Sequence, residues 1–323
     1  MRTMTFRDAL REALHEEMAR DESVFVIGED VVAHGGPYAV TQGIKERFPN
    51  RIFETPIAEA GIVGAGVGAA LAGMRPVVEI MYLDFITCAM DEVVNQAAKM
   101  RYMTGGQASV PMVIRLPCGV GRLLAAQHSQ IMESWFMHVP GLQVVVPSTP
   151  HDAKGLLKTA VRSPDPVLFF EYKRLYVAEG PVPEDEYVIE FGKADIKREG
   201  EDATVIAIGP MVQKALEAGI ALEDDGFDIE VVDPRTLSPL DVDTICASVA
   251  KTGRAVICEE DSSFAGSGAE IAATIAERCF HDLQAPVVRV GSPHVPMPFA
   301  APLVDRVVPG VAQVADAVRR VME

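Results

Sequence analysis

Glu59 is an isolated acidic residue beside a segment that carries no charge. It lies in residues 55–61 (TPIAEAG) and is the only acid between Glu54 and Glu79, while residues 61–73 (GIVGAGVGAALAG) are small and apolar. A segment of this kind must pack closely against another backbone. Such packing would leave the Glu59 carboxylate poorly hydrated and favour its protonated form. We therefore expect Glu59 to hydrogen-bond or to transfer a proton.

His128 is the second candidate for chemistry. It lies in residues 125–130 (AAQHSQ), after a glycine-rich turn at residues 119–121 and next to Ser129. A Ser-His hydrolase would need a serine in a nucleophile elbow, and the sequence contains no GxSxG. On the residues alone, a structural role for His128 is favoured.

A possible dinucleotide fingerprint overlaps the glycine segment. Gly64, Gly66 and Ala69 fit GxGxxA, but the fingerprint requires a strand that runs directly into its first glycine, and residues 56–60 (PIAEA) do not form one. Close packing of helices is the favoured explanation. An NAD-dependent oxidoreductase is an alternative that rests on this motif alone.

The composition excludes two classes of partner. The chain of 323 residues has 29 Lys plus Arg against 46 Asp plus Glu, a formal charge of −17, which would repel the phosphate backbone of nucleic acid. The N-terminal residues predict an amphipathic helix rather than a signal peptide, and the longest run without Asp, Glu, Lys, Arg or His, residues 60–74, is too short to cross a bilayer. We expect a cytoplasmic protein with no membrane contact. The five cysteines show no CxxC pair, which favours buried free thiols.

Strands alternate with helices twice along the chain, on either side of a polar stretch. This pattern predicts an α/β protein with two doubly wound parallel-sheet domains, at residues 1–178 and 201–323, joined by a linker at 179–200. A helix is predicted at residues 91–103, and another after Ser148, where Thr149 and Pro150 form a typical helix start. The predicted strands are residues 24–27, 76–81, 111–116, 143–147 and 166–170, then 204–208, 228–232, 255–258 and 287–290.

Several motifs taken together resemble one enzyme family. They are TPIAEAG with its glycine run, PVVEIMYLDF, DEVVNQAAKMRYMTGG, AAQHSQ and HVPGLQVVVPSTPHDAKGLL, followed by VVDPRTLSPLD, GSGAEIAA and VPMPFA. In this order they are similar to the beta subunit of the thiamine-diphosphate-dependent, decarboxylating component of the 2-oxoacid dehydrogenase complexes. The resemblance runs nearly from end to end and implies a transketolase-like pyrimidine-binding domain followed by a transketolase C-terminal domain.

The resemblance also implies roles for particular residues. Glu59 matches the acid that hydrogen-bonds the aminopyrimidine of thiamine diphosphate, and Phe85 matches the ring that lies against it. Ile57 and Met81 match neighbouring positions in that pocket, although Phe85 in MYLDFIT would count as core on composition alone. His128 matches the histidine associated with passing the acyl group to the lipoyl arm, which raises it from a structural to a catalytic candidate.

Metal sites and partners follow from the same resemblance. Some members bind a monovalent cation, such as K+, through backbone carbonyls, and the matching positions are Met112, Ala160, Val161, Ser163 and Asp165. The GDG motif by which thiamine enzymes hold Mg2+ and the diphosphate is absent from the sequence. In the family that half belongs to an alpha subunit. The resemblance therefore implies a heterotetramer of two alpha and two beta chains, which docks on a dihydrolipoyl acyltransferase core carrying lipoyl domains.

The substrate is left open by the sequence. Oxidative decarboxylation of a 2-oxoacid is the leading hypothesis, with pyruvate favoured over branched-chain 2-oxoacids. An acetoin dehydrogenase beta subunit is the alternative, because AAQHSQ and HVPGL are equally compatible with it. A non-catalytic scaffold would require that Glu59→Gln leave the assembled complex fully active.

Overall fold

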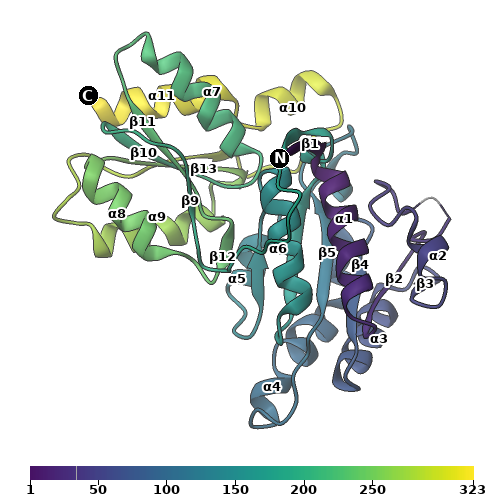
Figure 1. Ribbon diagram of the computed structural model, residues 1–323. Helices are drawn as coiled ribbons and strands as arrows, with labels where there is room; N and C mark the ends of the chain where they lie inside the picture. The colour runs from purple at the N-terminus through teal and green to yellow at the C-terminus, as the bar shows by residue number, and fades with distance from the viewer. Residues whose placement is uncertain (34) are drawn as a thin grey trace. The chain divides into compact units, whose positions relative to one another are not determined.

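The computed structural model describes residues 1–33 and 35–323, which form two compact units. Unit 1 comprises Met1–Cys118 and Trp135–Phe191, and unit 2 comprises Gly119–Ser134 and Gly192–Glu323. Each unit is described by itself below. The elements of both units are drawn in Figure 1.

Unit 1 is built on a parallel sheet. Within this unit the strand order is β6-β7-β5-β4-β2-β3, and every neighbouring pair is parallel. These strands are β2 (Val24–Gly28), β3 (Ile52–Glu54), β4 (Arg75–Glu79), β5 (Val113–Cys118), β6 (Gln143–Val145) and β7 (Val167–Tyr172). All six residues of β5 and of β7 are buried, as expected for central strands of a covered sheet.

The helical segments of unit 1 vary in regularity. They are α1 (Phe6–Arg20), α2 (Ile44–Arg47), α3 (Glu59–Leu71), η1 (Leu83–Ala89), η2 (Glu92–Ala97), α4 (Met100–Met103), α6 (Pro150–Arg162) and η4 (Lys173–Val177), with α5 (Glu133–Met137) at the sequence boundary of the units. The helix predicted at residues 91–103 is interrupted, because η2 is a π-helix that ends before α4 begins. The predicted start of α6 is confirmed, since the Thr149 side chain accepts a hydrogen bond from the Asp152 amide.

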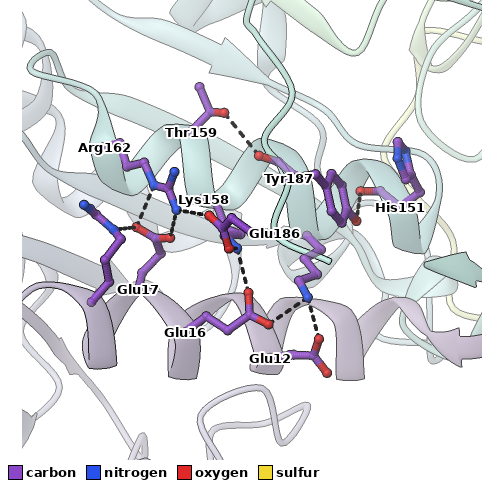
Figure 2. Close-up of polar contacts among 12 residues, drawn as sticks. Glu12, Glu16, Glu17, His151, Lys158, Thr159, Arg162, Glu186 and Tyr187 are labelled. Carbon is purple, nitrogen blue, oxygen red and sulfur yellow. Dashed lines mark hydrogen bonds and ion pairs between the residues drawn. The ribbon is translucent and has the colours of Figure 1, made fainter. Parts of the chain in front are cut away.

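Helices α1 and α6 lie side by side (Figure 1). Charged side chains join the two helices. The charged side chains between the helices form a set that we call the ion ladder: Glu12, Glu16, Glu17, Lys154, Lys158, Arg162 and Glu186. Figure 2 shows how they face one another. Lys158 donates to Glu16 at 2.6 Å although its side chain is fully buried, and Arg162 donates to Glu17 at 2.5 Å. Each ladder cation therefore has a carboxylate partner.

Residues 186–189, which fall within the predicted linker, pack on α6 as part of unit 1. The Tyr187 hydroxyl donates to the His151 carbonyl at 2.9 Å, and the Thr159 hydroxyl donates to the Ile189 carbonyl at 2.7 Å (Figure 2). Gly155 permits this approach, because a Cβ atom there would lie 2.6 Å from the Ile189 side chain. Two strands also occur between residues 179 and 200. They are β8 (Glu179–Val182), which pairs antiparallel with β1 (Arg2–Thr5), and β9 (Asp195–Arg198).

Unit 2 is a second α/β sandwich with the strand order β14-β13-β10-β11-β9. Its elements are η3 (Ala126–His128), β10 (Ala203–Ala207), α7 (Met211–Glu223), β11 (Ile229–Asp233), β12 (Thr236–Ser238), α8 (Val242–Thr252), β13 (Ala255–Ser262), α9 (Ser267–Arg278), β14 (Val288–Ser292), α10 (Ala301–Val307) and α11 (Val311–Met322). Helices α7 and α11 cover one face, and α8 and α9 pack together on the other (Figure 1). The predicted doubly wound architecture is confirmed, with one difference: β9 is antiparallel to β11.

The five cysteines are free thiols in the described chain, as predicted, but the prediction that they are buried is wrong for Cys88. No disulfide joins the five thiols of the described chain; Cys88 is exposed, Cys246 is half-buried, and Cys118, Cys258 and Cys279 are buried. Burial raises the pKa of the Cys279 thiol to about 12. None of the helices within residues 1–33 and 35–323 is long and apolar enough to cross a membrane.

Candidate functional site

The carboxyl ends of three adjacent parallel strands bring the predicted site residues of unit 1 to one sheet edge. In the order β4-β2-β3, Met81 and Phe85 follow β4, Glu29 follows β2, and Glu59 follows β3. Helix α3 packs against both β4 and η1, the segment that contains Phe85. In open parallel sheets this edge is where ligands bind.

Glu59 is the first residue of α3, and its carboxylate has no partner in the described chain. No hydrogen bond or ion pair joins it to residues 1–33 or 35–323, and its side chain is partly exposed. The helix N-terminus favours a negative charge there. The expected desolvation of Glu59 is not complete in this chain alone. Its neighbour Ile57 is 74% exposed, which is unusual for a large apolar side chain.

Glu29 is a second acid at this edge, and the sequence analysis missed it. Burial raises the pKa of Glu29 above its ordinary value, and the negative charges of Asp30 and Glu59 raise it further. The charge of Glu59 is thus felt by a carboxyl group 30 positions earlier in the sequence. Glu29 could have been identified from its position just after the strand predicted at residues 24–27, because ligand-binding residues are common at the ends of strands on this edge.

The glycine run does not form a phosphate-binding loop. Gly64 and Gly66 lie inside α3, and no strand leads directly into them, since β3 ends at Glu54. Gly66 instead lets the helix approach the sheet, because a Cβ atom there would lie 2.6 Å from the Val78 side chain. A dinucleotide fingerprint is therefore excluded, and the predicted packing role is confirmed for Gly66. Gly68, by contrast, faces open space in this chain.

Phe85 belongs to a chain of aromatic contacts. Its ring meets the edge of Tyr82 at 6.3 Å between centroids, Tyr82 meets Tyr38 at 6.5 Å, and Tyr38 stacks on Tyr176 at 4.4 Å. The Tyr176 hydroxyl donates to Glu171 at 2.6 Å. Rings in contact restrict one another's rotation. The orientation of Phe85 is thereby coupled to residues buried beneath the sheet edge.

A buried ion cluster lies at the inner end of that chain. Arg115 donates through two nitrogens to Glu171, each at 2.7 Å, and also to Glu79. All three side chains are almost completely inaccessible to solvent. Burial raises the pKa of Glu79, although the Arg115 charge opposes this. The sequence analysis did not predict this cluster, because its members come from three strands that only the fold brings together.

His128 belongs to unit 2. It ends the 3-10 turn η3 and is partly exposed, and Ala125, which precedes the turn, has φ 61° and ψ −162°. A residue with a side chain rarely adopts that conformation. Since Glu59 and Phe85 lie in unit 1, the structure of each unit does not itself group His128 with them.

The five predicted cation positions are close together in unit 1, but two of their carbonyls already bind a cationic side chain. The Arg75 guanidinium donates to the Val161 carbonyl at 2.9 Å and to the Ser163 carbonyl at 3.0 Å. The Met112 carbonyl accepts the Val167 amide, and the Ala160 carbonyl accepts the Ser163 amide. Asp165 pairs through its side chain with Arg101. These positions therefore do not offer five free carbonyls to a cation.

The sheet edge fits an aminopyrimidine cofactor better than a metal. It combines the unpaired Glu59 carboxylate, the partly exposed ring of Phe85 and the apolar side chains of Ile57 and Met81. A ring nitrogen could hydrogen-bond to the Glu59 carboxylate, and a flat heterocycle could pack against Phe85 and the two apolar side chains. Within the described residues no group of three or more His, Cys, Asp or Glu side chains could hold a metal ion.

Comparisons with known proteins show which families the chain resembles. The transketolase pyrimidine-binding domain family matches residues 2–178, and the transketolase C-terminal domain family matches residues 192–314. Among solved structures, a split-gene transketolase, described as an inactive beta4 tetramer, has a TM-score of 0.81 and 26% identity over 99% of this chain and 98% of that one.

Curated relatives of several substrate types have nearly equal similarity. The beta subunit of acetoin:2,6-dichlorophenolindophenol oxidoreductase from Cupriavidus necator is 46% identical, covering 100% of this chain and 98% of that protein. The pyruvate dehydrogenase E1 beta subunit of Rickettsia felis is 48% identical, covering 98% of each. The 2-oxoisovalerate dehydrogenase beta subunit of Bacillus subtilis is 48% identical, covering 93% of each. With two transketolase domains in order and these relatives matched almost end to end, the chain belongs to the family of beta subunits of the thiamine-diphosphate-dependent 2-oxoacid and acetoin dehydrogenases.

Proposed function

We propose that this chain supplies the pyrimidine-binding wall of a thiamine diphosphate site that oxidatively decarboxylates a 2-oxoacid, with pyruvate as the favoured substrate, and passes the acyl group to a lipoyl domain. The observation that carries the proposal is the unpaired Glu59 carboxylate at the start of α3, beside exposed Ile57. A carboxylate held at a ligand-binding edge without a protein partner is available to a ligand.

The residues at the edge have distinct roles in this proposal. Glu59 hydrogen-bonds a nitrogen of the aminopyrimidine ring and holds or releases a proton at that atom. Phe85 packs its ring against the heterocycle, and Ile57 and Met81 exclude water from it. The bound cofactor supplies the electron sink that decarboxylation requires.

His128 acts in the second half of the reaction. We assign it as the proton donor to the dithiolane of the lipoyl group during acyl transfer, since a histidine can give up a proton near neutral pH. This role is separable from decarboxylation, because an artificial electron acceptor can replace the lipoyl group.

The other wall of the site belongs to an alpha subunit in this proposal. The sequence lacks the GDG motif, so the alpha chain holds Mg2+ and the diphosphate, in an assembly of two alpha and two beta chains. Exposed Ile57 and the open side of α3 at Gly68 are surfaces that such a partner would cover. The assembly would dock on a dihydrolipoyl acyltransferase core.

Reconstitution tests the proposal. The chain is purified alone and together with its alpha subunit, and 2-oxoacid-dependent dye reduction is measured with thiamine diphosphate and Mg2+. We expect turnover of pyruvate by the pair and none by the single chain. Turnover by the single chain would contradict the shared site, and an inactive, correctly assembled pair would contradict the proposed reaction class.

Acetoin is the second candidate substrate. The relative from Cupriavidus necator, an acetoin:dye oxidoreductase subunit, matches the entire chain. The same reconstituted pair is therefore assayed with acetoin and with branched-chain 2-oxoacids. A higher kcat/KM for either of these than for pyruvate would replace pyruvate as the favoured substrate.

A further inference from the structure

The segment that carries His128 is a loop closed at its own base. It leaves β5 after Cys118, and the Gly119 amide donates to the Gln130 carbonyl at 3.2 Å. His128 lies two residues before that cross-link. We call this loop, residues 119–130, the histidine loop. A contact that fixes its base therefore also restricts His128.

A buried carboxylate holds the base of the histidine loop. Glu260 of β13 is 1% exposed, and its Oε1 accepts the Val120 amide at 2.7 Å. The strand position of Glu260 is fixed in turn by the Ser292 hydroxyl, which donates to the Glu260 carbonyl at 2.7 Å. Removing the acceptor of a buried amide leaves that amide without a partner and costs its desolvation. Glu260 thus holds the loop backbone through its Oε1 acceptor.

Apolar contacts hold the side chain of Val120. The Val120 side chain is 2% exposed and packs with Val304 and Val308, while Met297 covers this small cluster. Both the amide and the side chain of Val120 are therefore engaged within unit 2. One residue of the histidine loop carries two independent attachments.

The backbone of the histidine loop needs such attachment. Ala125 has φ 61° and ψ −162°, a region that residues other than glycine occupy only when their surroundings enforce it. Without a fixed base, relaxation of this residue would reorient the turn that ends in His128. The strain and the anchor occur in the same closed loop.

We propose that Glu260 is a positioning residue for acyl transfer, which acts by anchoring the histidine loop through the Val120 amide. The inference rests on the proposed role of His128. Glu260 touches neither substrate nor cofactor in this assignment. It determines the position of the His128 imidazole when the lipoyl group binds.

The first measurement does not depend on the proposed function. Amide hydrogen exchange of peptides covering the histidine loop is compared between the wild-type chain, Glu260→Gln and Glu260→Ala. We expect exchange to be about tenfold faster in Glu260→Ala and less affected in Glu260→Gln, whose side-chain oxygen can still accept the Val120 amide. The matched control is Glu230→Gln, since Glu230 is a buried carboxylate of the same sheet that pairs with Lys251 instead. Unchanged exchange in Glu260→Ala would overturn the anchor.

The second measurement uses the reconstituted complex with its alpha subunit. Dye reduction reports decarboxylation, and acylation of a lipoyl domain reports transfer. We expect Glu260→Ala to lower acyl transfer about tenfold more than dye reduction, whereas Glu230→Gln changes the two rates equally. Equal losses in Glu260→Ala would overturn the positioning role.

His128→Asn separates the two hypotheses. If this variant keeps full acyl transfer, the role assigned to His128 is wrong, and the positioning role of Glu260 falls with it, while the exchange measurement still decides whether the anchor exists. If His128→Asn loses acyl transfer and Glu260→Ala does not, the role of His128 stands and the inference about Glu260 is wrong.

Discussion

The ion ladder and the Glu59 edge are two regions of unit 1 that treat carboxylates in opposite ways. In the ladder, Glu16 accepts from both Lys154 and Lys158 (Figure 2). At the sheet edge Glu59 has no partner in the described chain, and its negative charge helps to raise the pKa of Glu29, another acid. Glu16 lies within α1, and Glu59 is the first residue of α3. Both helices pack on neighbouring elements.

This contrast separates the charges that support the fold from a charge that we propose serves a ligand. A satisfied acid contributes to stability, and its removal leaves a cation without a partner. An unpaired acid beside a like charge contributes little to stability, so a fold that keeps it does so for another reason. Substitutions in the two regions test this division.

Glu59→Gln should cause the largest loss of activity with the least loss of stability. Glutamine keeps the shape of the side chain but cannot hold or release the carboxyl proton. We expect turnover of the reconstituted complex to fall by about 100-fold or more, with an unfolding free energy of the chain within about 0.5 kcal/mol of wild type.

Glu17→Gln is the matched control for Glu59→Gln. Glu17 is buried in the ladder and pairs with Arg20 and Arg162. This variant should lose stability and keep its turnover per folded complex. The division between the two regions would fail if Glu17→Gln lost turnover and Glu59→Gln did not.

Arg115→Met should give the largest loss of stability. It would leave Glu79 and Glu171 buried without a cation, and breaking a buried ion cluster costs about 3–5 kcal/mol. Urea unfolding of the chain measures this change. Tyr176→Phe, which removes one hydrogen bond to Glu171, should cost only about 1 kcal/mol. Equal effects of the two substitutions would show that the guanidinium charge does not stabilise the cluster.

Lys158→Met should have a smaller effect, because its partners Glu16 and Glu186 keep 35% and 60% of their side chains exposed to water. We expect a loss of about 1 kcal/mol near neutral pH. The Lys158 hydrogen bond holds the pKa of Glu186 below its ordinary value of 4.5. A lowered pKa stabilises the folded chain above the unfolded value, and this contribution is lost as the pH falls through the folded value.

The pH dependence provides the check on Lys158→Met. The difference in unfolding free energy between wild type and variant should shrink when denaturant unfolding is repeated at about pH 3. A difference that stays constant with pH would instead assign the loss to the packing of the buried Lys158 stem.

Potassium should have the smallest effect of all. Arg75 already supplies a positive charge to the carbonyls of Val161 and Ser163, so exchanging Na+ for K+ should change the Tm of the chain by less than about 2 °C. Arg75→Ala is the comparison variant, since it frees both carbonyls. Saturable stabilisation of the wild-type chain by K+ alone would support a cation site at the five carbonyl positions despite Arg75.

Local patterns predicted most of the regular elements but not their irregular parts. The predicted strand at residues 24–27 is β2, and the apolar stripe of the N-terminal helix is buried, including Phe6 and Leu10. Strand β3 was missed because three residues carry too little periodicity, and β9 was not predicted to be antiparallel because pairing direction is set by distant residues. The π-helical turn of η2 likewise has no local signature in the sequence.

The candidate site was predicted only where motifs carried it. Glu59 and Phe85 were found through separate motifs, and the structure places the segments that hold them together, with α3 packed on η1. Glu29 was missed because its relation to Glu59 follows from the strand order β4-β2-β3. Glu260 could not be predicted either, since its contact with Val120 joins residues 140 positions apart.

Exposed Cys88 gives the chain a chemical reporter at the sheet edge where Glu59 lies. It lies in η1, three residues after Phe85, whereas Cys118, Cys258 and Cys279 are buried. The rate of alkylation at this thiol therefore measures how much of the η1 surface is open. Footprinting Cys88 with a maleimide before and after a partner is added would follow closure of the edge without any substitution in the chain.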